Sequence, residues 1–259
     1  MALAAVAVVL VVGVVTAPDR DADQPAPVAS ELVQDVVVPP VTLPAPPRIH
    51  PQFSAEGEVV WERTDLPQQA SDERGLAAAG DVVVLLAAGE PVLAVDVASG
   101  QDADAPPAVD ATATTEPDEP TFPTGGRTMT VEVVEERLRG TVDDAEAWRF
   151  LLPAPLAAPL VRSGPTLVVA LTDGTVAAID PVRGEARWQR DLEVVPTAVA
   201  GDGTLLLVGT ADGRVLRLDP EGRVVTTSQV GGGAVVALVA DRPAVVLLAD
   251  RLVGLDLTR

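Results

Sequence analysis

The chain has 259 residues, and its 38 acidic side chains outnumber its 18 basic ones, all arginine, giving a formal net charge of -20. Such a charge repels nucleic acid phosphates and argues against nucleic-acid binding. The sequence has no cysteine and one histidine, His50, which excludes thiol chemistry, disulfides, cysteine-rich zinc sites and most histidine-based catalysis. Because aromatic residues make up only 2 % of the chain, a core has to be built from valine, leucine and alanine.

The chain begins with an almost wholly apolar stretch of residues 2–17. This is slightly short for a membrane span of about 20 residues and is typical of the apolar part of a signal peptide. The small residues of Val15-Thr16-Ala17 suit a cleavage site. We predict an apolar helix over residues 1–17, either a cleaved signal peptide or a single-pass membrane anchor, and export to the bacterial cell envelope or secretion.

Two proline-rich stretches are predicted to lack a packed core of their own. Residues 18–52 include nine of the 24 prolines and form a predicted disordered linker. Residues 101–126 hold six acidic residues, no basic residue and five prolines, which indicates an acidic disordered insertion. The predicted domain spans residues 53–259 and contains this insertion.

The rest of the chain is repetitive. Apolar runs that end in aspartate recur at Val92–Asp96, Val176–Asp180, Val215–Asp219 and Leu252–Asp256, at intervals of 84, 39 and 37 residues. Trp148 and Trp188 are 40 residues apart, and Trp61 lies 87 residues before Trp148. The sequence therefore has a period of about 40 residues, with one degenerate unit over residues 102–150.

Each unit contains strands joined by tight turns. Thr166–Leu171 and Thr175–Asp180 flank the turn Asp173-Gly174, and the next unit repeats this plan around Asp212-Gly213. Asp-Gly between apolar runs is a strong hairpin signal, and a unit of about 40 residues has the size of a four-stranded propeller blade. We predict an all-β fold: a β-propeller of about five four-stranded blades, one degenerate, whose ring is small, incomplete or open.

The two ends of the repeat region are expected to share a blade. The last unit stops after its third strand, at residues 256–259, and residues 57–61 read as a fourth strand without a preceding unit. Joining them completes one blade, and such closure is how propellers avoid free strand edges.

Residues 174–188 resemble the tryptophan-docking motif of PQQ-like β-propellers, Ala-x-Asp-x-x-Thr-Gly-x-x-x-Trp, with Arg183 at the threonine position. The full match consists of Ala178, Asp180, Gly184 and Trp188. Ala94, Asp96 and Gly100 match the first half, and Asp219 and Asp256 belong to shorter versions. The resemblance spans about residues 54–259 and implies that Trp61, Trp148 and Trp188 pack between blades.

The resemblance extends to the non-enzymatic branch of that family, which includes the propeller lipoprotein of the outer-membrane assembly machinery. It implies a non-catalytic scaffold that binds a protein or another ligand at the cell envelope, with an envelope or extracellular protein as partner. We predict no catalytic residue, cofactor or metal site, a monomer, and membrane contact through the N-terminal segment only. Arg214, Arg217 and Arg223 are candidates for contacting an acidic partner, on a face shaped by the two Asp-Gly turns.

Two alternatives remain. A quinoprotein dehydrogenase-related protein with lost or retained cofactor binding would, by resemblance, need a vicinal cysteine pair and an Asn/Asp/Glu calcium set, and this sequence has no cysteine and no asparagine. A truncated or decayed propeller without a partner site is the other alternative, because PQQ-like propellers usually have seven or eight blades.

Overall fold

The computed structural model describes residues 56–67, 74–104 and 120–257. The predicted apolar helix of residues 1–17 and the linker of residues 18–52 lie outside these ranges, as do residues 105–119 of the predicted insertion. Within the described ranges, no helix has the length and hydropathy needed to cross a bilayer.

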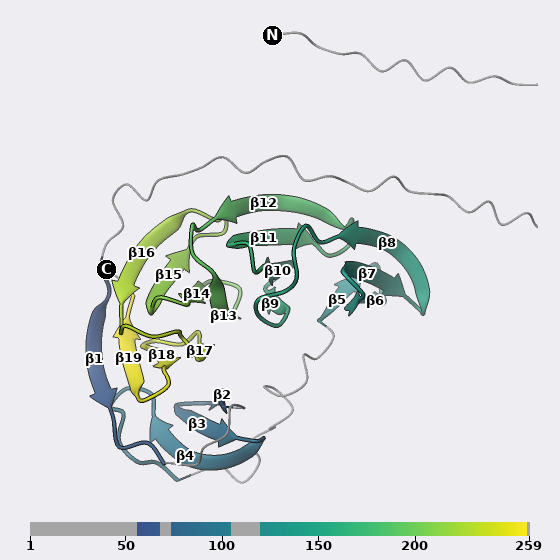
Figure 1. Ribbon diagram of the computed structural model, residues 1–259. Coiled ribbons are helices and arrows are strands. Elements are labelled where there is room, and N and C mark those ends of the chain that lie inside the picture. Colours follow the sequence, from purple (N-terminus) through teal and green to yellow (C-terminus); the bar gives the residue numbers. More distant parts are fainter. Residues whose placement is uncertain (1–55, 68–73, 105–119, 258–259) are drawn as a thin grey trace, which may run out of the picture. The chain divides into compact units, whose positions relative to one another are not determined.

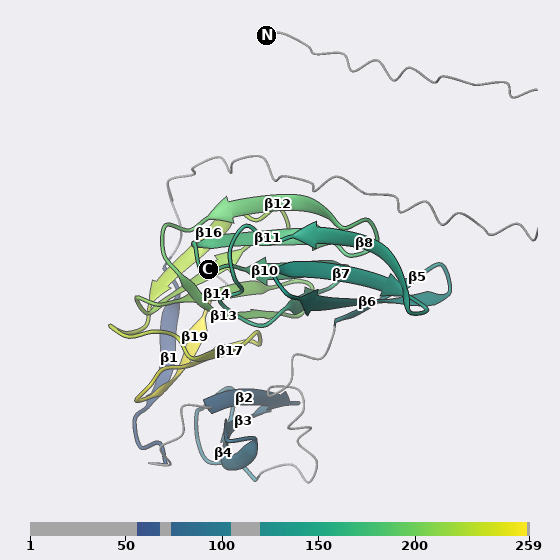
Figure 2. The ribbon, with the colours of Figure 1, turned by 45° about the vertical axis from the view of Figure 1, so that its right-hand side comes forward.

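The described residues form five antiparallel sheets, and consecutive strands are neighbours in each of them. The first sheet has three strands: β2 (Arg74–Ala79), β3 (Val82–Ala87) and β4 (Glu90–Asp96). The second contains β5 (Thr121–Thr124), β6 (Arg127–Val134), β7 (Arg137–Val142) and β8 (Ala145–Leu151), in the order visible in Figure 2. The third contains β9 (Val161–Ser163), β10 (Thr166–Ala170), β11 (Thr175–Asp180) and β12 (Glu185–Asp191).

The fourth and fifth sheets complete the described part of the chain. The fourth contains β13 (Pro196–Gly201), β14 (Leu206–Thr210), β15 (Arg214–Leu218) and β16 (Val224–Gln229). The fifth contains β17 (Ala237–Val239), β18 (Ala244–Leu247), β19 (Leu252–Asp256) and β1 (Glu58–Arg63). This all-β structure of repeated antiparallel sheets confirms the predicted β-propeller class.

The predicted joining of the two ends is observed. β1 pairs with β19 in an antiparallel register that runs from Glu58 opposite Asp256 to Arg63 opposite Leu252, with a bulge at Val59–Trp61. Figure 1 shows β1 beside β19, although the two strands come from opposite ends of the described chain. An N-terminal strand thereby becomes the fourth strand of the C-terminal sheet.

The inner strands are apolar on both faces because each sheet packs against a neighbour. β10, β14 and β18 are almost entirely buried. Four buried clusters join β5–β8 to β9–β12, β9–β12 to β13–β16, β13–β16 to the β1-containing sheet, and the β1-containing sheet to β2–β4. Among the described residues, a fifth cluster lies within the first sheet alone. It consists of Ala77, Val84, Leu86 and Ala94.

The structure corrects two details of the sequence analysis. The unit expected to be degenerate, residues 102–150, contains the regular sheet β5–β8, and the sheet with three strands is instead β2–β4. Polar side chains such as Thr130 and Glu132 alternate along β6 with buried Met129 and Val131. The repeat signal is weak there because one face of the sheet is polar.

The second correction concerns the predicted acidic insertion of residues 101–126. Thr121–Thr124 form strand β5, in which Phe122 is 2 % exposed. At the other end, Asp102 bridges to Val95, and the backbone amide of Ala103 donates to the carbonyl of Ala94. The stretch therefore contains strand β5 near one end and pairs with β4 through an isolated bridge near the other. A proline, here Pro123, is compatible with an edge strand such as β5.

Candidate partner-binding face

Three tryptophans connect neighbouring sheets through the same set of contacts. Each lies in the fourth strand of its sheet, opposite a small residue of the third strand, and donates its indole N–H to a backbone carbonyl of the next sheet. The small residues are Gly254 for Trp61, Gly140 for Trp148 and Ala178 for Trp188. The accepting carbonyls belong to Val97, Pro181 and Pro220, at 2.8, 2.7 and 2.9 Å respectively.

A turn glycine of the next sheet receives each indole ring. Gly184 has φ +68°, and a Cβ placed on it would lie 2.6 Å from Cδ2 of Trp148. Gly100 and Gly222 stand in the same relation to Trp61 and Trp188. Only glycine adopts this conformation without strain and leaves room for the ring. Trp148 is 9 % exposed, and its single N–H has its one partner.

The motif aspartates hold the turns that carry these carbonyls. The carboxylate of Asp180 accepts the backbone amides of Val182 and Arg183 and the guanidinium of Arg187. Partial burial by itself would raise the pKa of Asp180, but these hydrogen bonds outweigh it and hold the pKa below its usual value. The carboxylate is therefore ionised and fully engaged at neutral pH.

Asp96 and Asp219 behave in the same way. Ser99 donates its hydroxyl and its backbone amide to Asp96, and these bonds lower the pKa of that carboxyl. At Asp219, burial opposes the shift, but the backbone amide and side chain of Arg223 outweigh it and lower the pKa. The fourth motif aspartate, Asp256, ends strand β19. Asp96, Asp180 and Asp219 are turn-forming groups rather than groups poised to exchange protons.

At the junction of β13–β16 with the β1-containing sheet, an arginine of the third strand donates the hydrogen bond that a tryptophan of the fourth strand donates at three other described junctions. The pair Arg217–Thr226 stands where the other sheets pair a small residue with tryptophan. Nη1 of Arg217 donates to the carbonyl of Leu257 at 2.7 Å, and Leu257 follows Asp256 as Pro181 follows Asp180. This arrangement was not predicted from the sequence. Its signal was an aspartate repeat, Leu252–Asp256, without a tryptophan in the preceding unit.

Three cavities open at one end of the sheets, where the first strand turns into the second and the third into the fourth. We call this end the junction face; its turns include residues 164–165, 181–184, 202–205, 219–223 and 240–243. The cavities have volumes of about 310, 150 and 410 Å³ and are lined by these turns and by the adjoining strand ends. Each lies between neighbouring sheets, so its lining comes from segments far apart in sequence.

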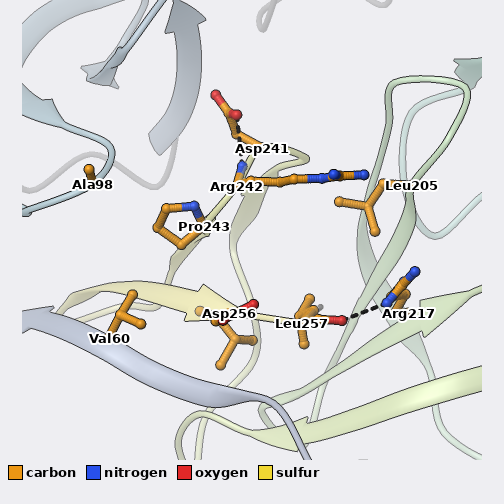
Figure 3. Close-up of a pocket in the computed structure, with 10 residues that line it drawn as sticks. Val60, Ala98, Leu205, Arg217, Asp241, Arg242, Pro243, Asp256 and Leu257 are labelled. Atoms are coloured by element: carbon orange, nitrogen blue, oxygen red, sulfur yellow. Dashed lines mark hydrogen bonds between the residues drawn. The ribbon is translucent and has the colours of Figure 1, made fainter. Parts of the chain in front are cut away.

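The 310 Å³ cavity lies at the arginine junction (Figure 3). Its apolar lining includes Val60, Leu205 and Pro243. Figure 3 shows the side chain of Arg242 extended toward Leu205, and Arg217 bonded to Leu257 below it. Asp241 and Asp256 also line the cavity, so its two arginines are balanced by two carboxylates.

The arginines selected from the sequence are engaged within the chain. Arg214 pairs with Asp212, Arg223 pairs with Asp219 and Glu221, and Arg217 bonds to the carbonyl of Leu257. The Asp-Gly turns also lie away from the cavities, because Asp173-Gly174 and Asp212-Gly213 join second strands to third strands. The cavities are thus at the opposite end of the sheets from the turns that were expected to shape the binding face.

No group of three or more His, Cys, Asp or Glu side chains arranged to hold a metal ion occurs in the described ranges. The arrangement is that of a structural repeat with cavities between its units, and its polar groups serve mainly turns and sheet junctions.

Comparison with known proteins identifies the repeat. A family model described as outer membrane protein assembly factor BamB matches residues 124–255. No curated protein matches the sequence.

Solved structures with similar folds include BamB from Moraxella catarrhalis, at 18 % identity and a TM-score of 0.38, with 74 % of this chain and 61 % of that chain covered. They also include BBS1N in complex with ARL6DN, soaked with lead, at 16 % identity and a TM-score of 0.43, with 71 % and 60 % covered. The chain thus spans about 60 % of the length of these solved chains. The family model covers just over half of the residues, and the chain therefore belongs to the family of outer membrane protein assembly factor BamB.

Proposed function

We propose that this protein is a non-catalytic scaffold that is exported to the bacterial cell envelope and binds a protein partner through the junction face. The observation that carries the proposal is the grouping of the three cavities at one end of adjacent sheets. The described junctions are rigidly packed, so the turns between them form a preorganised surface. The family description, an assembly factor for outer membrane proteins, favours a protein as the partner.

The contacts made by the tryptophans and the motif aspartates favour binding over catalysis. The tryptophans are docked against glycine and bonded to carbonyls, and the motif aspartates accept backbone amides. A general acid or base needs a pKa near the working pH, whereas the pKa values of Asp96, Asp180 and Asp219 are lowered. Export rests on the apolar composition of residues 1–17.

Affinity capture from the native envelope tests the scaffold function. The tagged full chain is crosslinked in envelope preparations, and we expect it to retain a defined envelope protein that a tag-only control does not retain. Absence of any specific partner would contradict the proposal.

The quinoprotein alternative has its own test. The full chain is incubated with PQQ and Ca²⁺ and assayed for dye-linked oxidation of alcohols and sugars. We expect no turnover, and turnover above a heat-treated control would replace the scaffold function by an enzymatic one.

The third alternative, a decayed propeller, predicts a molten or aggregated product. A scaffold with packed junctions is expected to be a folded monomer that melts in one sharp transition. Calorimetry together with size-exclusion chromatography of the full chain distinguishes the two.

A further inference from the structure

The largest cavity of the junction face concentrates positive charge in a strongly acidic chain. This cavity of about 410 Å³ lies between strand β5 and the turns β9–β10 and β11–β12. Three arginines line it, Arg162, Arg183 and Arg187, against one acidic side chain, Asp180. The chain as a whole carries 38 acidic and 18 basic residues. A local excess of positive charge in a hollow surface attracts anionic groups.

Arg162 is held in a fixed orientation. Its Nε donates to the carbonyl of Gly164 at 3.2 Å, and its Nη1 donates to the carbonyl of Thr121 at 3.0 Å. Its guanidinium carbon lies 5.4 Å from the ring centroid of Phe122, within the range of a cation–π contact. These contacts are to neutral groups, so they do not balance the positive charge of Arg162. Within the described ranges its Nη2 donors have no acceptor and are available to a ligand.

Asp180 does not cancel the charge of all three arginines. Its carboxylate pairs with Arg187, with Nη2 of Arg187 at 3.1 Å, and accepts two backbone amides. Arg187 also donates to the hydroxyl of Thr166. One carboxylate balances one guanidinium, so among the described residues Arg162 and Arg183 remain as an uncompensated pair of positive charges.

Arg183 is one of three described arginines, with Arg137 and Arg242, whose guanidinium group has no hydrogen bond or ion pair within the described ranges. Its backbone amide bonds to Asp180, but its exposed guanidinium makes no hydrogen bond or ion pair within the described part of the chain. Arg214, Arg223 and Arg251, by contrast, each have a nearby carboxylate partner. In a chain with a surplus of carboxylates, a cavity arginine with all its donors available is suited to an external acceptor.

Apolar groups surround this charge. Val182 is 45 % exposed, and Pro123 and Pro165 are also exposed at the cavity. The site therefore offers two guanidinium groups to an anion and aliphatic surface to what adjoins it. A carboxylate fits the planar fork of arginine, and an apolar residue beside it would cover the rim.

We propose that this cavity binds a glutamate or aspartate side chain of an acidic, partly apolar segment of the partner protein, with Arg183 and Arg162 as the carboxylate-binding groups. The inference rests on the proposed scaffold function and names the chemistry of its partner. Arg187 is held by Asp180, so we assign it to the β11–β12 turn and not to direct contact with the ligand.

Fluorescence polarisation with the full chain tests the site. The probe is a fluorescein-labelled peptide of alternating glutamate and leucine, and the control probe carries glutamine in place of glutamate. Arg183→Gln is expected to weaken binding of the acidic peptide about tenfold, the effect of losing one charge-assisted hydrogen bond of about 1.5 kcal/mol. Arg183→Lys keeps the charge but loses the fork, and about half of the effect on a logarithmic scale is expected.

Arg137→Gln is the matched control. Arg137 is exposed at the start of β7, lines none of the three cavities, and its loss changes the net charge by the same amount. We expect it to change affinity less than twofold. Equal weakening by Arg137→Gln and Arg183→Gln would show that only net charge matters and would overturn the site.

Competition separates the sources of the anion. If citrate or inorganic phosphate binds in an Arg183-dependent way while the acidic peptide does not, the cavity takes a free anion and the partner segment is wrong. If the peptide binds only after Glu116, Asp118 and Glu119 are changed to amides, the chain's own acidic segment is the occupant, and the proposal is again wrong.

Failure of this inference is distinguishable from failure of the scaffold function. If the Arg183→Gln chain and the original chain capture the envelope partner equally, the carboxylate site is refuted and the scaffold function is not. An original chain that captures no partner refutes the scaffold itself.

Discussion

At the scale of single residues, the tryptophan junctions depend on the packing of a large indole ring against glycine, which has no side chain. Trp148 occupies the space above Gly184 and Gly140, and its N–H reaches the carbonyl of Pro181. A large ring packed on glycine buries apolar area without a side-chain clash. These glycines therefore contribute to stability by leaving room for the indole ring, although they have no functional group.

Gly184→Ala is expected to destabilise the chain by more than 2 kcal/mol, about the cost of positive φ plus overpacking. Gly80→Ala is the matched control, because Gly80 has φ +63° but nothing within 4 Å of an added Cβ. Its cost should be about 1 kcal/mol, from backbone strain alone. Urea unfolding midpoints of the two variants measure the difference, and equal midpoints would contradict docking of Trp148 on this glycine.

The lowered pKa of Asp180 predicts that this residue stabilises the fold in a pH-dependent way. Its pKa in the folded chain lies below the usual value of 3.8, whereas the unfolded chain has a value of about 3.9. A lowered pKa adds stability that is present above about pH 4 and is lost as the pH falls through the folded value. Asp180→Asn removes this contribution, so it should cost about 1 kcal/mol at neutral pH and progressively less in acid.

Urea unfolding at about pH 7 and pH 3 checks this, with Asp144→Asn as the control. Asp144 is exposed, and asparagine suits its left-handed backbone. A stability difference for Asp180→Asn that grows in acid would contradict the role given to the carboxylate.

At the scale of strands and sheets, the sequence predicted most of what local pattern controls. The turns at Gly174 and Gly213, the sheet-forming runs beside them and the closure of the last sheet by residues 57–61 all follow from short-range signals. β5 was missed because its four residues include Pro123 and lie in an acidic, proline-rich stretch. Its place depends on burial of Phe122 against the neighbouring sheet, which is a long-range contact.

Closure by β1 can be tested with an engineered disulfide, because the chain has no cysteine of its own. Glu58→Cys combined with Asp256→Cys places two thiols on residues that are directly opposite in the ladder. Oxidation should give a monomeric crosslinked chain that is stabilised by roughly 4 kcal/mol, because the bond closes a very long loop.

Electrophoresis without reductant shows the crosslink, and unfolding measurements show its effect. Glu58→Cys with Asp250→Cys is the control, since Asp250 precedes β19 at its other end and is not opposite Glu58. A crosslink that forms equally in both variants, or in neither, would contradict the observed register.

At the scale of the whole molecule, function depends on surfaces that no single repeat contains. The cavity at Arg183 combines β5 with two turns of the next sheet, and the cavity at Arg242 combines β1, the β17–β18 turn and the end of β19. Sequence spacing locates each turn but not which side chains meet across a junction. For this reason Arg217 is the one sequence-chosen arginine that lines either of the two largest described cavities, and the other arginines that line them, Arg162, Arg183, Arg187 and Arg242, were not chosen.

Site-specific photocrosslinking in cells tests the central claim, that the protein binds its partner through the junction face. A photoreactive residue is placed at Val182, which is 45 % exposed beside the largest cavity, or at Thr172, an exposed residue of the β10–β11 turn at the opposite end. We predict a discrete adduct with an envelope protein from position 182 and none from position 172. Adducts from position 172 alone, or from neither position, would contradict the account.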